Sequence, residues 1–293
     1  MGSDIVIFGS LLLDRYFEVD RWPARGQDGY FDREETFVGG CAINMAATIH
    51  NLGGAAHVVS CVGQDETGAL IRDYLAKHGL SVELLHPAEG VTGSCLVFSE
   101  PDGERTFLTR VGVEDRFPDG LAEKAVQIAP AWAGITGYFL LGSDGARVMD
   151  CLERLHETGT RILFDPSPLA GDIPREILRR VLAVSDILTP NETELAVLGG
   201  DSAIPGLVEA GKTLVLKRGS QGGTVYSPEE TFDYASVLCE AVDTTGAGDS
   251  FSGALLHAMT QSMPLKQAIA LAARCAAKTV QIHGPHGFWK LEE

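Results

Sequence analysis

Short runs of apolar residues alternate with stretches of helical periodicity along most of this 293-residue chain. The first run, Ile5–Phe8, ends at Gly9 and is typical of a strand buried on both faces of a parallel sheet. Helical spacing of apolar residues follows at 70–75 and 148–155. This alternation predicts an α/β fold with a doubly wound, mainly parallel sheet, in which ligands bind beyond the carboxyl ends of the strands. Further strands are predicted at 58–59, 135–141, 162–164, 187–188 and 214–216.

Two regions interrupt the alternation, residues 11–38 and 92–111. In the second, Pro101, Asp102 and Gly103 have the composition of a turn that joins two short strands. We expect both regions to form a small β lid over the sheet edge of a single domain spanning 1–293. An ordinary surface hairpin fits the same pattern.

Composition and charge narrow the cellular setting and the partners. No segment approaches the roughly 20 apolar residues of a membrane helix, and the N-terminus lacks the pattern of an export signal. We therefore expect a cytoplasmic protein without a membrane partner, whose six scattered cysteines are reduced thiols. The net charge of −17 argues against nucleic acid as a partner. It does not argue against ATP, because surface charges are screened over roughly 8 Å at physiological salt.

The segment 243–253 has the strongest chemical character. Apolar residues at 251, 254, 255 and 258 predict a helix whose N-terminus holds Gly246, Ala247 and Gly248. Free backbone N–H groups and about half a positive charge at such an end can hold a phosphate. Asp249, in the first turn, suits the base that accepts a proton from an attacking hydroxyl. A glycine turn with Asp249 as a capping residue is the alternative.

A second glycine pair, Gly39-Gly40, precedes another predicted helix that ends near Gly53. The glycines would let a substrate lie against the backbone, and Asn44 can exchange hydrogen bonds with hydroxyls. A well-packed helix that carries one polar residue by chance is the alternative.

Taken together, the motifs resemble those of the PfkB (ribokinase-like) carbohydrate kinase family over nearly the whole chain. They occur in the family's order: Gly9-Ser10 with Asp14, then Phe37 to Asn44, Thr189 to Glu194, and Asp243 to Asp249.

The resemblance implies a role for each motif. Asp14, Gly40 and Asn44 would bind substrate hydroxyls, Asp249 would be the base, and the amides of 246–248 would form the anion hole. Asn191 and Glu194 resemble the N-x-x-E element that organises Mg²⁺ and the ATP phosphates through water, although Asn191 also suits a helix cap.

Three further implications of the resemblance concern the nucleotide, a cation and assembly. Lys217 and Gly219 resemble the nucleotide-side loop, with Lys217 as a phosphate contact. Asp243 and Thr245, with backbone near Val280 and Gly284, resemble a monovalent-cation site, which leaves a potassium requirement open. Many relatives pair their lids, so a homodimer is expected.

The implied reaction is transfer of the γ-phosphoryl group of MgATP to a hydroxyl, most simply a primary one, of a monosaccharide or related sugar. Ribose itself is disfavoured, because Leu12, Cys41 and Leu141-Gly142 replace polar residues of ribokinase. A nucleoside kinase is the first alternative, with Tyr16, Phe17, Phe37 and Phe107 available for a base pocket. A non-catalytic sugar-binding regulatory protein is the second, although the presence of Asp249 argues against it.

Two other motif matches have the wrong context. Gly206, Gly211, Lys212 and Thr213 satisfy the P-loop pattern, but they lead into a strand rather than a helix. Gly246-x-Gly248 has Phe251 in place of the third glycine of a dinucleotide fold. We therefore expect neither a P-loop nor a dehydrogenase.

Overall fold

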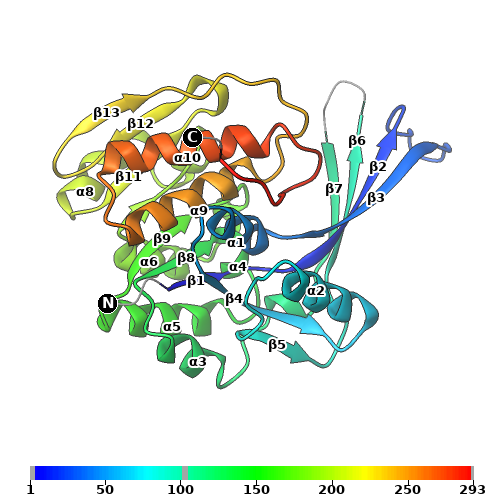
Figure 1. Ribbon diagram of the computed structural model, residues 1–293, viewed down its shortest axis with the longest axis horizontal. Helices are drawn as coiled ribbons and strands as arrows, with labels where there is room; N and C mark the ends of the chain where they lie inside the picture. The colour runs from blue at the N-terminus through cyan, green and yellow to red at the C-terminus, as the bar shows by residue number, and fades with distance from the viewer. Residues whose placement is uncertain (1–3, 101–104, 292–293) are drawn as a thin grey trace.

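The computed structural model describes residues 4–100 and 105–291, in which strands and helices alternate along the chain (Figure 1). The predicted turn at Pro101, Asp102 and Gly103 lies outside the described residues. The strands are β1 (Ile5–Phe8), β2 (Leu12–Val19), β3 (Phe31–Gly39), β4 (Ala56–Gly63), β5 (Leu85–Ala88), β6 (Ser94–Ser99), β7 (Arg105–Arg110), β8 (Trp132–Thr136), β9 (Arg161–Asp165), β10 (Ile187–Leu188), β11 (Thr213–Lys217), β12 (Gly223–Tyr226) and β13 (Thr231–Tyr234). The α-helices are α1 (Cys41–Asn51), α2 (Glu66–Lys77), α3 (Leu121–Gln127), α4 (Gly137–Leu140), α5 (Gly145–Glu157), α6 (Arg175–Val184), α7 (Glu192–Val197), α8 (Ile204–Glu209), α9 (Ala247–Thr260) and α10 (Leu265–Thr279).

The larger sheet has the order β13-β12-β11-β10-β9-β8-β1-β4-β5. Its strands from β11 through β5 pair in parallel, whereas β12 and β13 extend the other edge in antiparallel fashion. The chain winds outward from β1 first through β4 and β5, then in the other direction through β8 to β11. The predicted doubly wound, mainly parallel sheet is confirmed.

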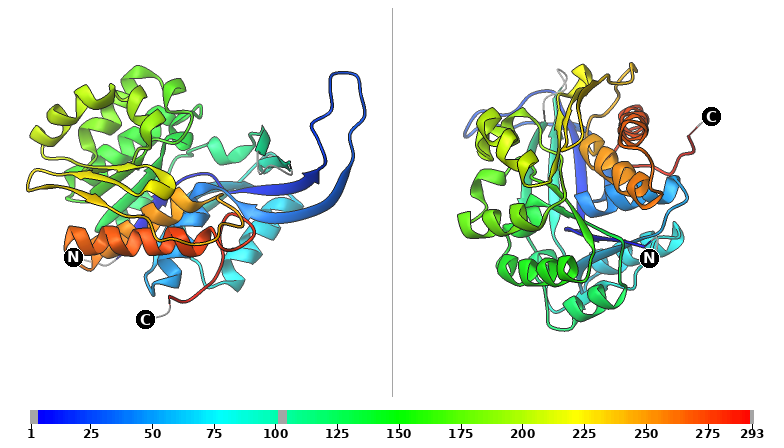
Figure 2. Two further views of the ribbon diagram at one scale, coloured as in Figure 1. Left: turned by 90° about the horizontal axis from the view of Figure 1, so that it is seen from above. Right: turned by 90° about the vertical axis from the view of Figure 1, so that its left-hand side faces the viewer.

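Helices cover both faces of this sheet, as Figure 2 shows. On one face, Ile43 of α1, Leu255 of α9 and Ile269 of α10 belong to one fully buried cluster. On the other, Leu152 of α5 and Val181 of α6 belong to a second. Each such side chain contributes roughly 1.5–3 kcal/mol when it leaves water, so the two clusters hold the strands whose ends carry the site.

One predicted strand needs correction. The apolar run 135–141 is a strand only up to Thr136, and the chain continues as the short helix α4. The backbone turns where Gly137 packs so closely that a Cβ there would lie 1.8 Å from the carbonyl oxygen of Pro166. The prediction failed because an apolar run alone does not distinguish a strand from a buried helix.

A second sheet, with the order β3-β2-β6-β7, stands beside the main body, and its β2–β3 hairpin projects away from it (Figure 2). Apart from Gly39, its strands fall within the regions predicted for the lid. Tyr16, Cys95 and Val97 form its small buried core. We call this sheet the lid. In the described part of the chain, no helix combines the length and apolarity needed to cross a membrane.

Candidate active site

The N-terminus of α9 lies open to an anion. Gly246 precedes the helix at φ 75°, and a Cβ at this position would lie 1.9 Å from the carbonyl oxygen of Pro285, so only glycine fits. Among the described residues, no side chain caps this helix end. A Cβ on Gly248 would meet only Nζ of Lys217, at 3.5 Å. The N–H groups of the first turn, including that of Ala247, are therefore in the setting that binds phosphate.

Asp249 lies in the first turn of α9 and is joined to α1. Nδ2 of Asn44 donates a hydrogen bond of 2.8 Å to Oδ2 of Asp249. Burial and the nearby charge of Asp165 raise the pKa of Asp249 to about 6, against the hydrogen bonds from Asn44 and Cys41 and the charge of Lys217. The fold thus brings together the predicted base and a predicted substrate-binding residue, and the carboxylate is ionised and basic near neutral pH.

Asp14 lies near the start of α1, and its buried carboxylate could accept a hydrogen bond from a polar ligand. Its carboxylate packs on Gly39, where a Cβ would lie 2.0 Å from Oδ2, and Gly40 at φ 108° starts the helix. Asp14 is 8% exposed, and no described residue donates a hydrogen bond to its carboxylate. Burial raises its pKa to about 7. A buried carboxylate without a partner is costly, so a substrate hydroxyl would be a favourable donor here.

The ends of three neighbouring strands meet at Asp165, which sequence reasoning missed. Its Oδ2 accepts hydrogen bonds from Nζ of Lys217 at 2.9 Å, the hydroxyl of Ser252 at 3.0 Å and that of Thr189 at 3.1 Å. Burial opposes the charged form of Lys217, but the carboxylates of Asp165 and Glu194 outweigh it and raise the pKa of the lysine. The signal in the sequence was a carboxylate directly after the buried run 162–164, at the ligand-binding edge of the sheet.

Asn191 and Glu194 form a reciprocal cap on α7. Oδ1 of Asn191 accepts from the Glu194 backbone N–H at 2.8 Å, and Glu194 Oε2 accepts from the Asn191 N–H at 2.8 Å. The backbones of Asn191 and Lys217 also form an isolated parallel β-bridge. Glu194 is 4% exposed, and burial and the charge of Asp165 raise its pKa. The cap therefore holds Glu194 beside the Asp165–Lys217 pair.

The charge balance of this region suits a hydrated divalent cation. Asp165, Glu194 and Asp249 influence one another electrostatically, and all three act on the ammonium group of Lys217. No group of three acidic, histidine or cysteine side chains within 4–100 and 105–291 is arranged to bind a metal directly. Surplus negative charge without a direct cage matches Mg²⁺, which keeps several waters and binds through phosphates.

Lys217 and Lys212 each lie close to a glycine in the sequence, but they contact different groups. Lys217 points toward Gly248, and Gly219 beyond it adopts φ 54° with open space around its Cα. Lys212, in the P-loop-like sequence, donates instead to the carbonyls of Ala183 and Ser185 at 2.9 and 2.8 Å. The ammonium group of Lys212 thus joins the end of α6 to the start of β11.

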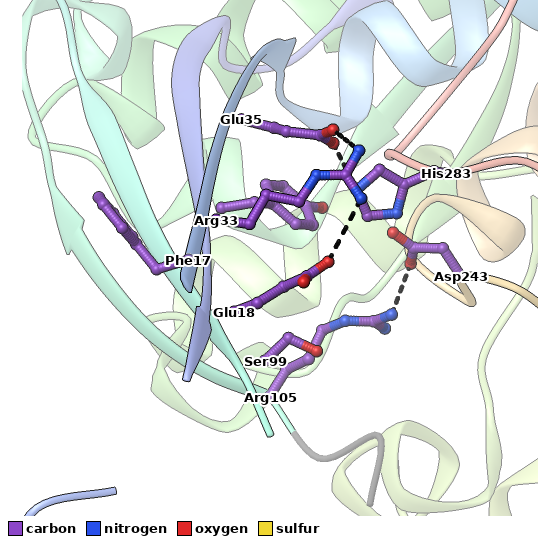
Figure 3. Close-up of a pocket in the computed structure, with 9 residues that line it drawn as sticks. Phe17, Glu18, Arg33, Glu35, Ser99, Arg105, Asp243 and His283 are labelled. Carbon is purple, nitrogen blue, oxygen red and sulfur yellow. Dashed lines mark hydrogen bonds and ion pairs between the residues drawn. The ribbon is translucent and has the colours of Figure 1, made fainter. Parts of the chain in front are cut away.

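Asp243 is the most buried carboxylate beside this site, at 1% exposure. Its Oδ1 accepts from the Thr245 N–H at 2.8 Å, and its Oδ2 from the Gly284 N–H at 3.2 Å. Arg105 of the lid adds an ion pair of 2.9 Å (Figure 3). Asp243 therefore joins the loop before α9 to the loop after α10 and to the lid.

His286 is another residue that sequence reasoning missed. Its Nδ1 lies 3.0 Å from Oδ1 of Asn44, and its Nε2 lies 3.1 Å from the hydroxyl of Tyr74. Burial lowers its pKa to about 4, so the ring is neutral at physiological pH. His286 orients the amide of Asn44 toward Asp249, and no local motif marked it because it reaches the site from the C-terminal segment.

Comparison with known proteins agrees with this geometry. The model of the pfkB family carbohydrate kinases matches residues 3–290. The chain belongs to this family, and the prediction of an ATP-dependent carbohydrate kinase is confirmed at the level of the family.

Its relatives include sugar and nucleoside kinases. The uncharacterised sugar kinase YegV of Escherichia coli is 29% identical, over 96% of this chain and 90% of the relative. The nucleoside kinase of Methanothermobacter thermautotrophicus is 27% identical, over 96% and 90%. A crystal structure of a candidate ribokinase II from E. coli, in complex with ATP and Mg²⁺, superposes with a TM-score of 0.85 at 26% identity, over 96% of this chain and 94% of that one.

Proposed function

We propose that this protein transfers the γ-phosphoryl group of ATP to a hydroxyl, most simply a primary one, of a monosaccharide or related sugar. The observation that carries the proposal is the 2.8 Å hydrogen bond between Asn44 and Asp249. It holds the Asn44 amide, which would bind substrate, beside the basic carboxylate of Asp249 at the uncapped N-terminus of α9. Three requirements of phosphoryl transfer, a base, a hydroxyl-binding group and an anion hole, meet at one point.

The roles of the residues follow from their contacts. The acceptor hydroxyl would lie against Asp249, which takes its proton, while Asp14 and Asn44 bind neighbouring hydroxyls over Gly39 and Gly40. The N–H groups at 246–248 would stabilise charge on the transferred phosphoryl group. Lys217 and Asn191 would contact the ATP phosphates on the other side, next to Gly219. Lid closure would exclude water and limit ATP hydrolysis.

Mg²⁺ fits the site beside Glu194 and Asp165, bound through water, where it would neutralise phosphate charge. The E. coli structure with ATP and Mg²⁺ supports MgATP as the phosphoryl donor.

The cytoplasmic location and the homodimer remain predictions. Apolar residues that the lid exposes support pairing between lids: Phe31, Phe107 and Leu108 are each more than half exposed. An absence of the dimer in analytical ultracentrifugation would contradict this prediction.

The surroundings of the acceptor favour a sugar over a nucleoside. Tyr16 and Phe37 pack edge to face at 5.1 Å within the lid, and Phe17 stacks on Phe98 at 5.3 Å. Tyr16 and Phe17 are buried and pack against other lid rings, which leaves them less available to stack on a base. The archaeal relative keeps nucleosides as the second candidate. Leu12 packs in the lid core and Cys41 contacts Asp249, so neither supplies the polar contact that ribokinase has there.

An ADP-release screen over sugars, sugar acids and nucleosides tests the proposal. We expect turnover on one sugar class, and much weaker turnover with the isosteric variant Asp249→Asn. Turnover on nucleosides alone would favour the second candidate. Binding of a sugar without any turnover would favour a non-catalytic regulatory protein.

A further inference from the structure

The carboxylate of Asp243 already accepts from three donors. The N–H groups of Thr245 and Gly284 donate hydrogen bonds to it, and the guanidinium of Arg105 forms an ion pair with it, with Nη2 2.9 Å from Oδ1. Nη1 of Arg105 lies 3.4 Å from the hydroxyl of Thr244. A carboxylate this deeply buried needs a positive charge nearby, and Arg105 supplies it.

The same surroundings fit a monovalent metal cation poorly. Such an ion takes oxygen ligands, but the carbonyl of Val280 already accepts the N–H groups of Val242 at 2.7 Å and Asp243 at 3.1 Å. Gly284 directs its N–H, a hydrogen-bond donor, toward Asp243. Nε of Arg105 is buried and has no hydrogen-bond partner among the described residues, and this donor would repel a cation.

Arg105 is the first residue of β7 and therefore belongs to the lid. The lid also meets the body where Nε2 of His283 lies 2.6 Å from Oε2 of Glu35. Phe37 also packs on Gly284, where a Cβ would lie 2.6 Å from the ring. The lid thus contacts the two loops that Asp243 joins, and one of them leads directly into the anion hole.

A second lid arginine provides a contrast in the same view. Arg33 contacts Glu18 and Glu35 on the lid itself, and its side chain is 56% exposed, against 17% for Arg105 (Figure 3). Exposed pairs of that kind contribute little, whereas a buried pair leaves a costly charge when one partner is removed. Arg105 therefore has a role that Arg33 does not share.

We propose that Arg105 supplies the positive charge at Asp243 in place of a monovalent metal cation, so that closing the lid, rather than binding K⁺, fixes the loop of the anion hole. The proposal deepens the kinase assignment and rests on it for its kinetic part. Arg105 acts through Asp243 and is a positioning residue.

Thermal unfolding and turnover in matched salts test this inference. The wild type, Arg105→Ala, Arg105→Lys and the control Arg33→Ala are compared in KCl, NaCl and choline chloride at about 0.15 M. We expect the wild-type Tm to agree within about 1 °C, and its kcat within about twofold, among the three salts.

The variants should differ from one another in both Tm and kcat. Arg105→Ala should lose about tenfold or more in kcat in choline and regain part of it in KCl, with a K⁺-specific rise in Tm, because the charge is then missing. Arg105→Lys should stay independent of K⁺, and Arg33→Ala should resemble the wild type. A K⁺-specific rise in the Tm or kcat of the wild type, or an Arg105→Ala indistinguishable from Arg33→Ala, would overturn the inference. If no acceptor is found, the kinase proposal fails, while the Tm measurements still decide the cation question.

Discussion

Two buried ion pairs lie beside the N-terminus of α9. Their N–O distances are equal, but their residues come from different parts of the molecule. Lys217 and Asp165 lie 2.9 Å apart with side chains 16% and 8% exposed, and Arg105 and Asp243 lie 2.9 Å apart with 17% and 1% exposed. The first pair, which we call the core pair, joins strands of the main sheet. The second, the lid pair, joins the lid to the loop before α9. The core pair needs only the main sheet, whereas the lid pair needs the lid in the position that the structure shows.

The remaining partners of the two carboxylates reinforce this difference. Asp165 accepts two hydroxyls, from Thr189 and Ser252, both inside the main body. Asp243 accepts two backbone N–H groups from loops. The side of the site that we propose for the nucleotide is therefore built by the main body, and the other side is completed by the lid.

Removing the proposed base, Asp249, should lower kcat more than breaking either ion pair does. Asp249→Asn keeps a side chain of the same shape but cannot take a proton, so kcat should fall about 10³-fold. Binding of ATP and acceptor, measured by calorimetry, should change little. Glu192→Gln, at an exposed acid on α7, is the control. A loss smaller than about tenfold would shift the catalytic role from Asp249 to the pairs.

Breaking the core pair should lower the free energy of unfolding more than breaking the lid pair. Lys217→Met leaves Asp165 charged in the core and should lower the free energy of unfolding by about 3 kcal/mol. The added change Asp165→Asn should restore most of it. Arg105→Met should cost less, about 2 kcal/mol, because an opened lid lets some water reach Asp243. Equal losses for Lys217→Met and Arg105→Met in urea unfolding would abolish the distinction.

Gly246→Ala probes the loop between the pairs. A side chain at φ 75° and against the Pro285 carbonyl should cost about 2 kcal/mol in unfolding free energy. Gly248→Ala should fold almost normally, since its nearest neighbour is Nζ of Lys217, yet turn over more slowly because the methyl group enters the anion hole. The reverse order of stability would contradict the described loop.

The smallest effect is expected at His286, outside both pairs. His286→Leu removes the hydrogen bond that orients Asn44 and should lower kcat about fivefold, equally at all pH values from about 6 to 9, because the ring is neutral there. Tyr74→Phe, which removes only the outer bond, should stay within about twofold. A pH-dependent effect of His286→Leu would point instead to a charged ring.

Much of this picture follows from local sequence. Apolar runs predict the main sheet, and the glycine-led helices with Asp249 and Asn44 mark the two halves of the site. Gly137 shows the limit, because a close contact with Pro166 ends a strand that its apolar sequence would continue. Asp165, Arg105 and His286 gain their roles only from partners far along the chain, which no short motif encodes.

The pH dependence of kcat, compared between the wild type and Asp249→Asn at saturating ATP and acceptor, tests the central claim most directly. Asp249 must be ionised to accept a proton, so activity should fall as the pH drops through about 6, or somewhat lower when Mg²⁺ adds positive charge. Saturation keeps the titration of Asp14 in the free enzyme, near pH 7, out of kcat. We predict that Asp249→Asn lacks this acidic limb. The same limb in Asp249→Asn would show that another group is the base.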